Sequence, residues 1–553
     1  MGSHAVFQPV ATFQTHPDSY RHWQLAVDGS IATLTLSVDE NGGLRSNDYE
    51  LKQNSYDLGV DIELADSIER LRFEHPAVNT VIVTSDYPKV FCAGANIKML
   101  ATSTHAFKVN FCRYTNETRC GIEDATEKSG IRFIAALNGT AAGGGYELAL
   151  ACEEIYLIDD GSSVVSLPEV PLLGVLPGTG GLTRLVDKRM VRRDVADLFC
   201  TKAEGFRARD AVKYTLVDGS FPRSKWDDQI SDLAAESATR AKRGDAGIAL
   251  PPITSELSED GLVRTYKHVE LALNGADRVA TITINAPADA APSGVEDLRA
   301  EGANTWSFRA FRELDNALLH LRFNHAELGL IVMRTQGDAD AVLAHDGALA
   351  SMDGDWLARE IRLFQARTLR RVDNTARSIF TVVDEGSCFA GSLFELVLAA
   401  DRSFMLEDED GQVTVRVSEA SGGSFPMSTG ITRLQARFMR DATQVGRALA
   451  TDGPLDAPEA FDLGLVTLAP DDIDWDDEIR IAIEERVSLS PDALTGMEQN
   501  LRFVGAENCD SKIFGRLSAW QNWIFQRPNA VGDEGALTLY GHPTRPRFDW
   551  DRT

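Results

Sequence analysis

Short apolar runs alternate with amphipathic segments along the chain. Runs rich in Val, Ile, Leu and Phe, a composition typical of buried strands, stand at 78–85, 132–137 and 153–158. Segments with apolar residues at helical spacing stand at 58–73, 146–152 and 228–242. Strands that alternate with helices in this way predict an α/β fold.

The same pattern occurs twice. The segment YRHWQLAVDGSIATLTLSV at 20–38 reappears as YKHVELALNGADRVATITIN at 266–285. Further along, IAALNGTAAGGGYELALAC pairs with FTVVDEGSCFAGSLFELVLAA, and LPGTGGLTRL pairs with FPMSTGITRL. Near the end of each copy, Trp226-Asp-Asp stands opposite Trp475-Asp-Asp. Two copies of one unit therefore account for most of the chain.

The repeat also predicts the domain boundaries. The stretch RGDAGIALPPITSELSEDG between the copies has the Gly, Pro and acidic composition of a linker. We expect a disordered tail at 1–17, a catalytic domain at 18–245, a degenerate copy at 260–489, and a helical segment with an extended tail at 490–553.

Composition excludes several classes of partner. The 553 residues include 55 Lys and Arg against 83 Asp and Glu, a formal net charge of −28 without basic clusters, which argues against nucleic acid and anionic membranes. Seven cysteines without CxxC spacing, and no apolar signal core or membrane-length apolar run, indicate a reduced, cytoplasmic protein. The ten histidines form no HExxH or similar ligand motif, so no metal is expected.

Two small-residue turns follow predicted strands and open predicted helices. One is Ala93-Gly94-Ala95 in VFCAGANIKML, and the other is the glycine triplet 143–145 in NGTAAGGGYELALAC. Helix N-termini present unpaired N–H groups to anions, and two such groups that converge make an oxyanion hole. Close packing of helix on strand is the alternative explanation for the glycines.

Two isolated carboxylates accompany these turns. Glu147 lies in the first turn of an otherwise apolar helix, and Glu169 lies in the apolar, proline-bounded run SSVVSLPEVPLLGVLPGTGG. Acidic residues are favourable near helix N-termini, but a buried carboxylate is unfavourable unless it has a partner or a task. Two carboxylates over one pocket are the arrangement that general acid/base work on water requires.

The motifs FCAGANIKML, NGTAAGGGYELALAC and LPEVPLLGVLPGTGGLTRL together resemble the crotonase (enoyl-CoA hydratase/isomerase) superfamily, in family order across 20–240. The resemblance implies tandem crotonase-like ββα spiral domains of α/β class with a C-terminal helical extension. It further implies an acyl-CoA thioester substrate, an enolate intermediate, and an oxyanion hole made by the N–H groups of Ala95 and Gly144. Glu147 and Glu169 match the two catalytic glutamates of the hydratase branch.

The tandem architecture narrows the reaction that the resemblance implies. The tandem architecture is similar to that of superfamily members that cleave an aromatic ring in aerobic benzoate degradation. These members convert 2,3-epoxy-2,3-dihydrobenzoyl-CoA and two waters to 3,4-didehydroadipyl-CoA semialdehyde and formate. The resemblance implies that this reaction needs no oxygen, metal or redox cofactor. Coenzyme A is part of the substrate. An ordinary enoyl-CoA hydratase and a non-catalytic acyl-CoA-binding protein remain the alternatives.

The second copy keeps the carboxylates but loses the first turn. Glu395 and Glu419 stand where the first copy has Glu147 and Glu169, whereas AVLAHDGA replaces VFCAGAN and Ser392 takes the place of Gly144. We therefore expect the second copy to be a structural partner, because a repeated fold can keep its packing after losing its site.

Three further residues are weaker candidates. Cys112 follows the first turn in a helix that borders the acyl pocket in crotonases, and we hypothesise that its thiol faces the ring or its oxygens; an inert buried cysteine is the alternative. Arg45 and Lys98 are candidates for binding the CoA phosphates, or else are surface charges. Crotonases usually assemble, so a homo-oligomer, in particular a dimer, is expected.

Overall fold

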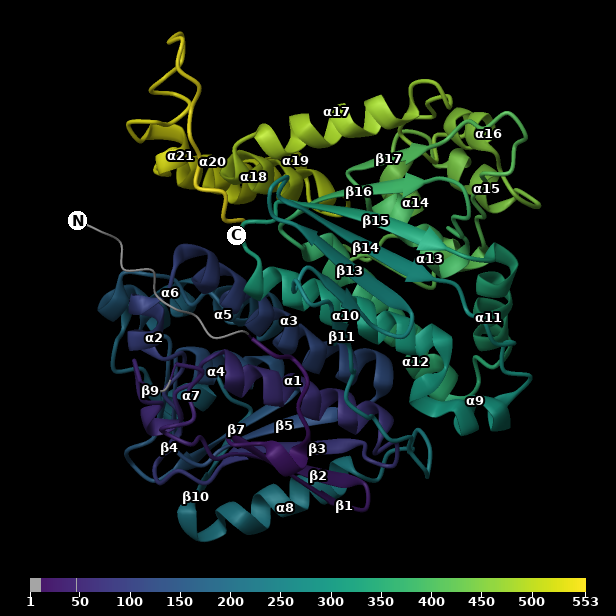
Figure 1. Cartoon of the computed structure of the whole chain (residues 1–553). Coiled ribbons are helices and arrows are strands. Elements are labelled where there is room, and N and C mark those ends of the chain that lie inside the picture. Colours follow the sequence, from purple (N-terminus) through teal and green to yellow (C-terminus); the bar gives the residue numbers. More distant parts are fainter. Residues whose placement is uncertain (1–10, 46) are drawn as a thin grey trace. The chain divides into compact units, whose positions relative to one another are not determined.

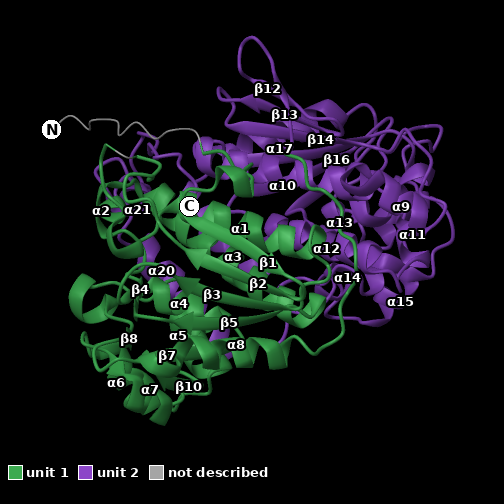
Figure 2. Cartoon of the chain, turned by 90° about the horizontal axis from the view of Figure 1, so that it is seen from below, with its two compact units in different colours: residues 1–252 green, residues 253–553 purple. Residues whose placement is uncertain are grey.

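The computed structural model describes residues 11–45 and 47–553, which divide into two compact units, 1–252 and 253–553 (Figure 1 and Figure 2). The first ten residues of the expected disordered tail lie outside the described part. Within that part, no helix is long and apolar enough to cross a membrane.

Six strands form the main sheet of the first unit, in the order β1-β2-β3-β5-β7-β10. β1 pairs antiparallel with β2, and every other neighbouring pair is parallel. Burial alternates along β2, whereas five of the six residues of β5 are buried, as expected of a central strand covered on both faces. The bounds are β1 Trp23–Asp28, β2 Ile31–Leu36, β3 Thr80–Ser85, β5 Arg132–Leu137, β7 Glu154–Asp159 and β10 Gly219–Pro222.

Helices cover both faces of this sheet. α1 (Leu58–Phe73) and α3 (His105–Ser129) lie together on one face, and α8 (Trp226–Ser237) lies on the other (Figure 1). Trp226 and Ile230 of α8 pack on side chains of β5 and β7. The other helices are α2 Ile97–Thr102, α4 Gly144–Ala151, α5 Gly181–Thr183, α6 Arg193–Thr201 and α7 Ala208–Lys213.

The helix expected at 228–242 ends earlier, at Ser237. The side-chain amide of Asn79 donates to the carbonyls of Ala238 (3.3 Å) and Arg240 (2.8 Å). These carbonyls lie beyond the end of α8 and are paired with a side chain from another part of the chain.

A second, smaller sheet brings the site segments together. Its strands β4 (Val90–Cys92), β6 (Thr140–Ala142), β8 (Val164–Ser166) and β9 (Phe206–Arg207) run in that order, with β4–β6 and β6–β8 parallel. β4 leads into the Gly94 turn, β6 into the glycine triplet, and β8 towards Glu169. Three segments that are distant in sequence therefore leave neighbouring strands at the same edge.

The second unit repeats the main sheet but not the small one. Its seven strands run in the order β11-β12-β13-β14-β15-β16-β17. In its described residues, the counterpart of the small sheet is limited to isolated bridges, Ala390 with Arg416 and Val415 with Leu455. The strands are β11 Glu256–Leu257, β12 Val263–Thr265, β13 Val269–Asn274, β14 Val279–Asn285, β15 Leu330–Gln336, β16 Ser378–Val383 and β17 Arg402–Met405. The helices are α9 Val295–Glu301, α10 Trp306–Asn324, α11 Ala339–Ser351, α12 Trp356–Asn374, α13 Gly391–Ala399, α14 Arg433–Arg437, α15 Thr443–Leu449, α16 Ala457–Asp462 and α17 Trp475–Ser488.

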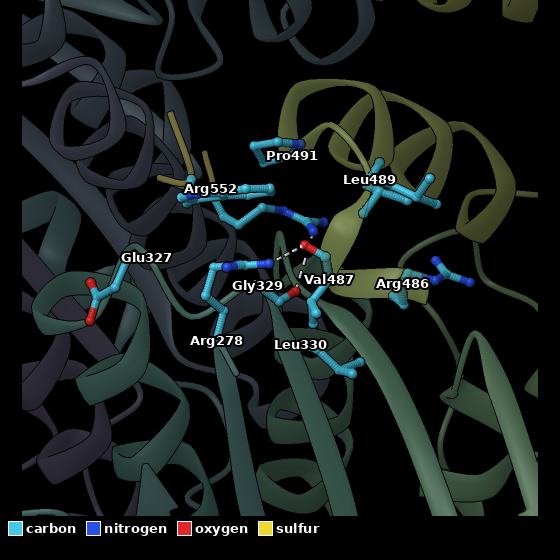
Figure 3. A pocket seen from close by; sticks show the side chains of 11 residues that line it. Arg278, Glu327, Gly329, Leu330, Arg486, Val487, Leu489, Pro491 and Arg552 are labelled. Atoms are coloured by element: carbon cyan, nitrogen blue, oxygen red, sulfur yellow. Dashed lines mark hydrogen bonds between the residues drawn. The ribbon is translucent and has the colours of Figure 1, made fainter. Parts of the chain in front are cut away.

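The C-terminal segment is helical and its tail packs back on the second unit. It comprises α18 (Pro491–Arg502), α19 (Cys509–Lys512), α20 (Ser518–Ile524) and α21 (Pro528–Val531). Arg552 donates to Glu498 (2.5 Å) and to the Gly329 carbonyl (3.2 Å). Arg552, Gly329 and Arg278 line one small pocket (Figure 3), and the Arg278 guanidinium lies 3.8 Å from the ring centre of Trp550. The tail is thus held by a buried ion pair and a cation–π contact.

Candidate active site

Two backbone N–H groups lie at the turns that the sequence indicates. Ala95 follows β4, and Gly144 is the first residue of α4, so its N–H has no acceptor within the helix. Tyr56 N–H donates to Gly94 O (3.0 Å), and Tyr56 O accepts from Asn96 N–H (2.8 Å). This parallel bridge leaves the N–H of Ala95 on the opposite side of the strand. No hydrogen bond among the described residues uses the N–H of Ala95 or of Gly144 outside regular helix and sheet pairing.

The two turns approach each other too closely for side chains. Gly94 has φ 90°, and a Cβ there would lie 2.9 Å from the nitrogen of Gly144. Gly143 has φ 52°, and a Cβ there would lie 2.7 Å from Oε1 of Glu169. Glycine is needed at both positions for backbone conformation as well as for space. The close approach is what an oxyanion hole built from two backbone donors requires.

Glu147 is held by three donors. Its side chain is buried, and Oε1 accepts from the N–H groups of Thr179 (3.0 Å) and Gly181 (2.8 Å). Oε2 accepts from the hydroxyl of Thr179. Three donors on one carboxylate fix its orientation, in the first turn of α4 where the helix dipole favours negative charge.

Glu169 differs from Glu147 in its surroundings. It begins the helical turn Glu169–Leu173 and is buried, yet its Oε2 has no hydrogen-bond partner among the described residues. Burial, with a further contribution from the charge of Glu147, raises the pKa of Glu169 to about 7. A carboxyl group with that pKa exchanges protons readily at neutral pH. The first unit therefore has one fixed carboxylate and one that is suited to proton transfer.

The loop that holds Glu147 is itself braced. Arg184 donates to Thr179 O (3.1 Å) and to both carboxylate oxygens of Glu123 (2.9 and 2.8 Å), while the Asn116 side chain donates to Gly178 O (3.0 Å). Sequence reasoning missed these residues as parts of the site. Thr179 stands inside the motif LPGTGGLTRL, but the motif gives no sign that its hydroxyl would meet a carboxylate.

Cys112 lies on α3 in the electrostatic neighbourhood of the site. Burial raises the pKa of its thiol to about 11, and the charges of Glu147 and Asp61 act in the same direction. The group is therefore a thiol rather than a thiolate at neutral pH. Its hypothesised contact with the ring stays a prediction.

The structure places the two candidates for CoA phosphates differently. Arg45 is buried, donates to Ser103 Oγ (2.8 Å) and Met99 O (3.3 Å), and thereby holds the end of α2. Lys98 is exposed on α2 itself. Phosphate binding by either residue stays a prediction, and the exposed ammonium of Lys98 is the more accessible group.

In the second unit a side chain fills the position that corresponds to the expected oxyanion hole. Ser392, the counterpart of Gly144, donates its N–H to Oδ2 of Asp346 (2.6 Å). Asp346 comes from α11, which includes the residues AVLAHDGA in place of the first turn. A Cβ on the preceding Gly391 would lie 2.3 Å from the same Asp346 oxygen. A carboxylate of the protein itself thus occupies the place of an anionic ligand.

The carboxylates of the second unit also lack the arrangement found in the first. Glu395 is buried and forms an ion pair with Arg433 (3.0 Å), which also pairs with Asp373 (2.6 Å). Glu419 is exposed, whereas its counterpart Glu169 is buried. An ion-paired carboxylate and an exposed one form no acid/base pair over a pocket.

The first unit thus combines two N–H groups that have no acceptor outside regular pairing among the described residues, a fixed carboxylate, and a carboxyl group whose pKa is raised to about 7. Such a set can stabilise an oxyanion while it moves a proton to or from water. Among the described residues, no group of three or more His, Cys, Asp or Glu side chains is placed to hold a metal ion.

The chain is similar to several known proteins. Residues 50–244 match the family described as enoyl-CoA hydratase/isomerase. The chain is 52% identical to the benzoyl-CoA-dihydrodiol lyase of Aromatoleum evansii over 551 residues. This alignment covers 99% of each chain. It is 30% identical over 217 residues to the fatty acid oxidation complex subunit alpha of Shewanella loihica, covering 39% of this chain and 28% of that one.

A solved structure from Geobacillus kaustophilus, described as an enoyl-CoA hydratase, is 32% identical, covering 41% of this chain and 76% of that one with a TM-score of 0.35. The family match and the full-length relative confirm the expected α/β crotonase-like fold class.

Proposed function

We propose that this chain, which belongs to the enoyl-CoA hydratase/isomerase family, cleaves the ring of 2,3-epoxy-2,3-dihydrobenzoyl-CoA. The products are 3,4-didehydroadipyl-CoA semialdehyde and formate, and two waters are consumed. The observation that carries the proposal is the 52% identity to a benzoyl-CoA-dihydrodiol lyase across both units, since an ordinary single-copy hydratase would match only one of them.

The thioester oxygen binds at the N–H groups of Ala95 and Gly144. Negative charge develops on this oxygen when the thioester becomes an enolate, and preorganised donors stabilise that charge more than the neutral carbonyl. The positive end of α4 points at the same place, which adds to the stabilisation.

Glu147 and Glu169 carry out the proton transfers. Glu147, fixed by the Thr179 loop, and Glu169 position and deprotonate water, and they return protons to the opened epoxide and the ring carbon. Carbon–carbon cleavage with release of formate follows from the hydroxylated intermediate. Each carboxylate acting as acid or base contributes about 100- to 10,000-fold to the rate.

The proposed reaction consumes only the thioester and water, so it requires no redox cofactor. Coenzyme A enters as part of the substrate, and Lys98, exposed on α2, is our candidate contact for its phosphates. We place the protein in the cytoplasm, where thioester substrates are formed. We expect it to assemble as a homo-oligomer.

The test is to mix the purified chain with enzymatically generated 2,3-epoxybenzoyl-CoA and measure formate, with mass spectrometry of the CoA product. Crotonyl-CoA hydration is the parallel assay. Formate in amounts equal to a six-carbon semialdehyde thioester supports the proposal. Crotonyl-CoA hydration without formate would instead assign the chain to the ordinary hydratases.

A further inference from the structure

Tyr56 is attached by its backbone to the first donor of the proposed oxyanion hole. It is the bridge partner of Ala95, through hydrogen bonds from Tyr56 N–H to Gly94 O (3.0 Å) and from Asn96 N–H to Tyr56 O (2.8 Å). Any movement of the Tyr56 backbone therefore moves the Ala95 turn.

The side chain of Tyr56 reaches the second donor. A Cβ on Gly144 would lie 2.0 Å from the Tyr56 hydroxyl oxygen, so the hydroxyl lies directly against this glycine. One residue thus contacts both segments that supply the N–H groups: its backbone pairs beside Ala95, and its hydroxyl lies against Gly144.

Tyr56 is only 3% exposed, so its hydroxyl is buried. This hydroxyl nevertheless has no hydrogen-bond partner among the described residues. Other tyrosine hydroxyls in the same unit are paired: Tyr20 with Asp66 (2.5 Å), Tyr49 with Asp57 (2.6 Å) and Tyr146 with Leu216 O (2.6 Å). An unpaired buried hydroxyl is unfavourable, and such groups in native proteins call for a ligand or a task.

The surroundings of Tyr56 keep its hydroxyl protonated, as a hydrogen-bond donor must be. The guanidinium of Arg119 lies 5.3 Å from the centre of the Tyr56 ring, pairs with Asp61 (3.1 Å) and donates to Gly144 O (3.4 Å). Burial raises the pKa of Tyr56 well above its ordinary value, and the charge of Arg119 only partly opposes this. The hydroxyl therefore keeps its proton at every working pH.

We propose that the Tyr56 hydroxyl is a third donor to the thioester oxygen, beside the N–H groups of Ala95 and Gly144. The proposal rests on the function proposed above, because it uses the same placement of the thioester. A side-chain donor strengthens the hole as charge develops on the oxygen, so it acts on the transition state more than on binding.

The experiment compares Tyr56→Phe with Tyr20→Phe, a matched control that loses a paired hydroxyl outside the site. For Tyr56→Phe we expect kcat for formate release to fall by about 100-fold, with KM little changed. The second readout is the infrared C=O stretch of bound benzoyl-CoA labelled with ¹³C at the carbonyl. It should move to higher frequency in Tyr56→Phe, because one hydrogen bond to the oxygen is lost, and should not move in Tyr20→Phe.

The stretch measurement requires binding and no turnover, so it separates the two proposals. An unchanged kcat together with an unchanged C=O frequency in Tyr56→Phe would overturn the role of Tyr56 while leaving ring cleavage intact. A wild-type protein that binds benzoyl-CoA but releases no formate from the epoxide would overturn the proposed reaction instead. In that case a frequency shift in Tyr56→Phe would still support the third donor.

Discussion

The two units of the chain have matching main sheets and different chemistry at matching helix N-termini. At α4 of the first unit, Gly144 N–H faces no acceptor of the protein among the described residues, whereas at α13 of the second, Ser392 N–H donates to Asp346. Glu147 is held by neutral donors, whereas Glu395 is held by the cation Arg433. The sheet and its helices thus persist in the second unit, while Asp346 and Arg433 change what surrounds the matching N–H group and glutamate.

The largest expected difference between the units concerns Glu147 and its counterpart in the second unit, Glu395. Glu147→Gln should lower kcat for formate release by about 100- to 10,000-fold, because the variant cannot exchange protons with water. Glu395→Gln should leave kcat unchanged and lower the unfolding temperature, because Arg433 loses part of its buried ion pairing. A comparable loss of turnover in both variants would show that the second unit is also catalytic.

Substitution of Glu169 should change the pH dependence of the rate, whereas substitution of its counterpart Glu419 should not. If ionised Glu169 is the base, kcat/KM rises with pH through about 7, the value to which burial and Glu147 raise its pKa. Glu169→Gln should lower the rate by about 100-fold or more and abolish this rise, whereas Glu419→Gln should leave the profile unchanged. Full pH–rate profiles of the three proteins provide the check, and a rise that persists in Glu169→Gln would assign it to another group.

The Gly94 turn should be nearly as sensitive as the carboxylates. Gly94→Ala forces a side chain at φ 90° to within 2.9 Å of the Gly144 nitrogen, which should displace the donors and lower kcat by about 100-fold. Gly130→Ala is the control, since Gly130 has φ 70° with open space around it and caps α3. It should lower the unfolding temperature alone; equal activity losses would mean that strain in general, not the hole, reduces the rate.

The smallest expected effect concerns Asp346. Burial raises the pKa of Asp346 to about 6, above its ordinary 3.8, so the folded state holds the proton more tightly than the unfolded state. Wild-type stability should therefore fall relative to Asp346→Asn as pH rises from about 4 to above 6. Unfolding temperatures of both proteins across this range test the sign, and a pH-independent difference would mean that Asp346 is not a buried charge.

Local pattern was enough to predict the framework of the fold. The helix expected at 58–73 coincides with α1, and the run at 132–137 coincides with β5, because periodicity and burial agree there. The end of α8 was predicted too late, and the carbonyls that follow it accept from Asn79, a contact with another part of the chain that no local pattern shows. The turns at Gly94 and Gly143 were visible because only glycine suits their backbone and space.

The support of the site depends on tertiary contacts that no local pattern reveals. Thr179 and Arg184 stand in a recognised motif, but their roles follow from a loop that folds onto α4. Asp346 likewise stands in a segment marked only by its lack of the glycine turn. The sequence predicted that this copy had lost the first turn, and the structure adds that a carboxylate fills its place.

We infer that each chain has one thioester site and that this site lies in the first unit. Calorimetric titration of wild type, Gly94→Ala and Asp346→Asn with benzoyl-CoA measures this directly. We expect one site per chain in wild type, weakened binding in Gly94→Ala, and one unchanged site in Asp346→Asn. Two sites per chain in wild type, or full binding that survives Gly94→Ala, would contradict it.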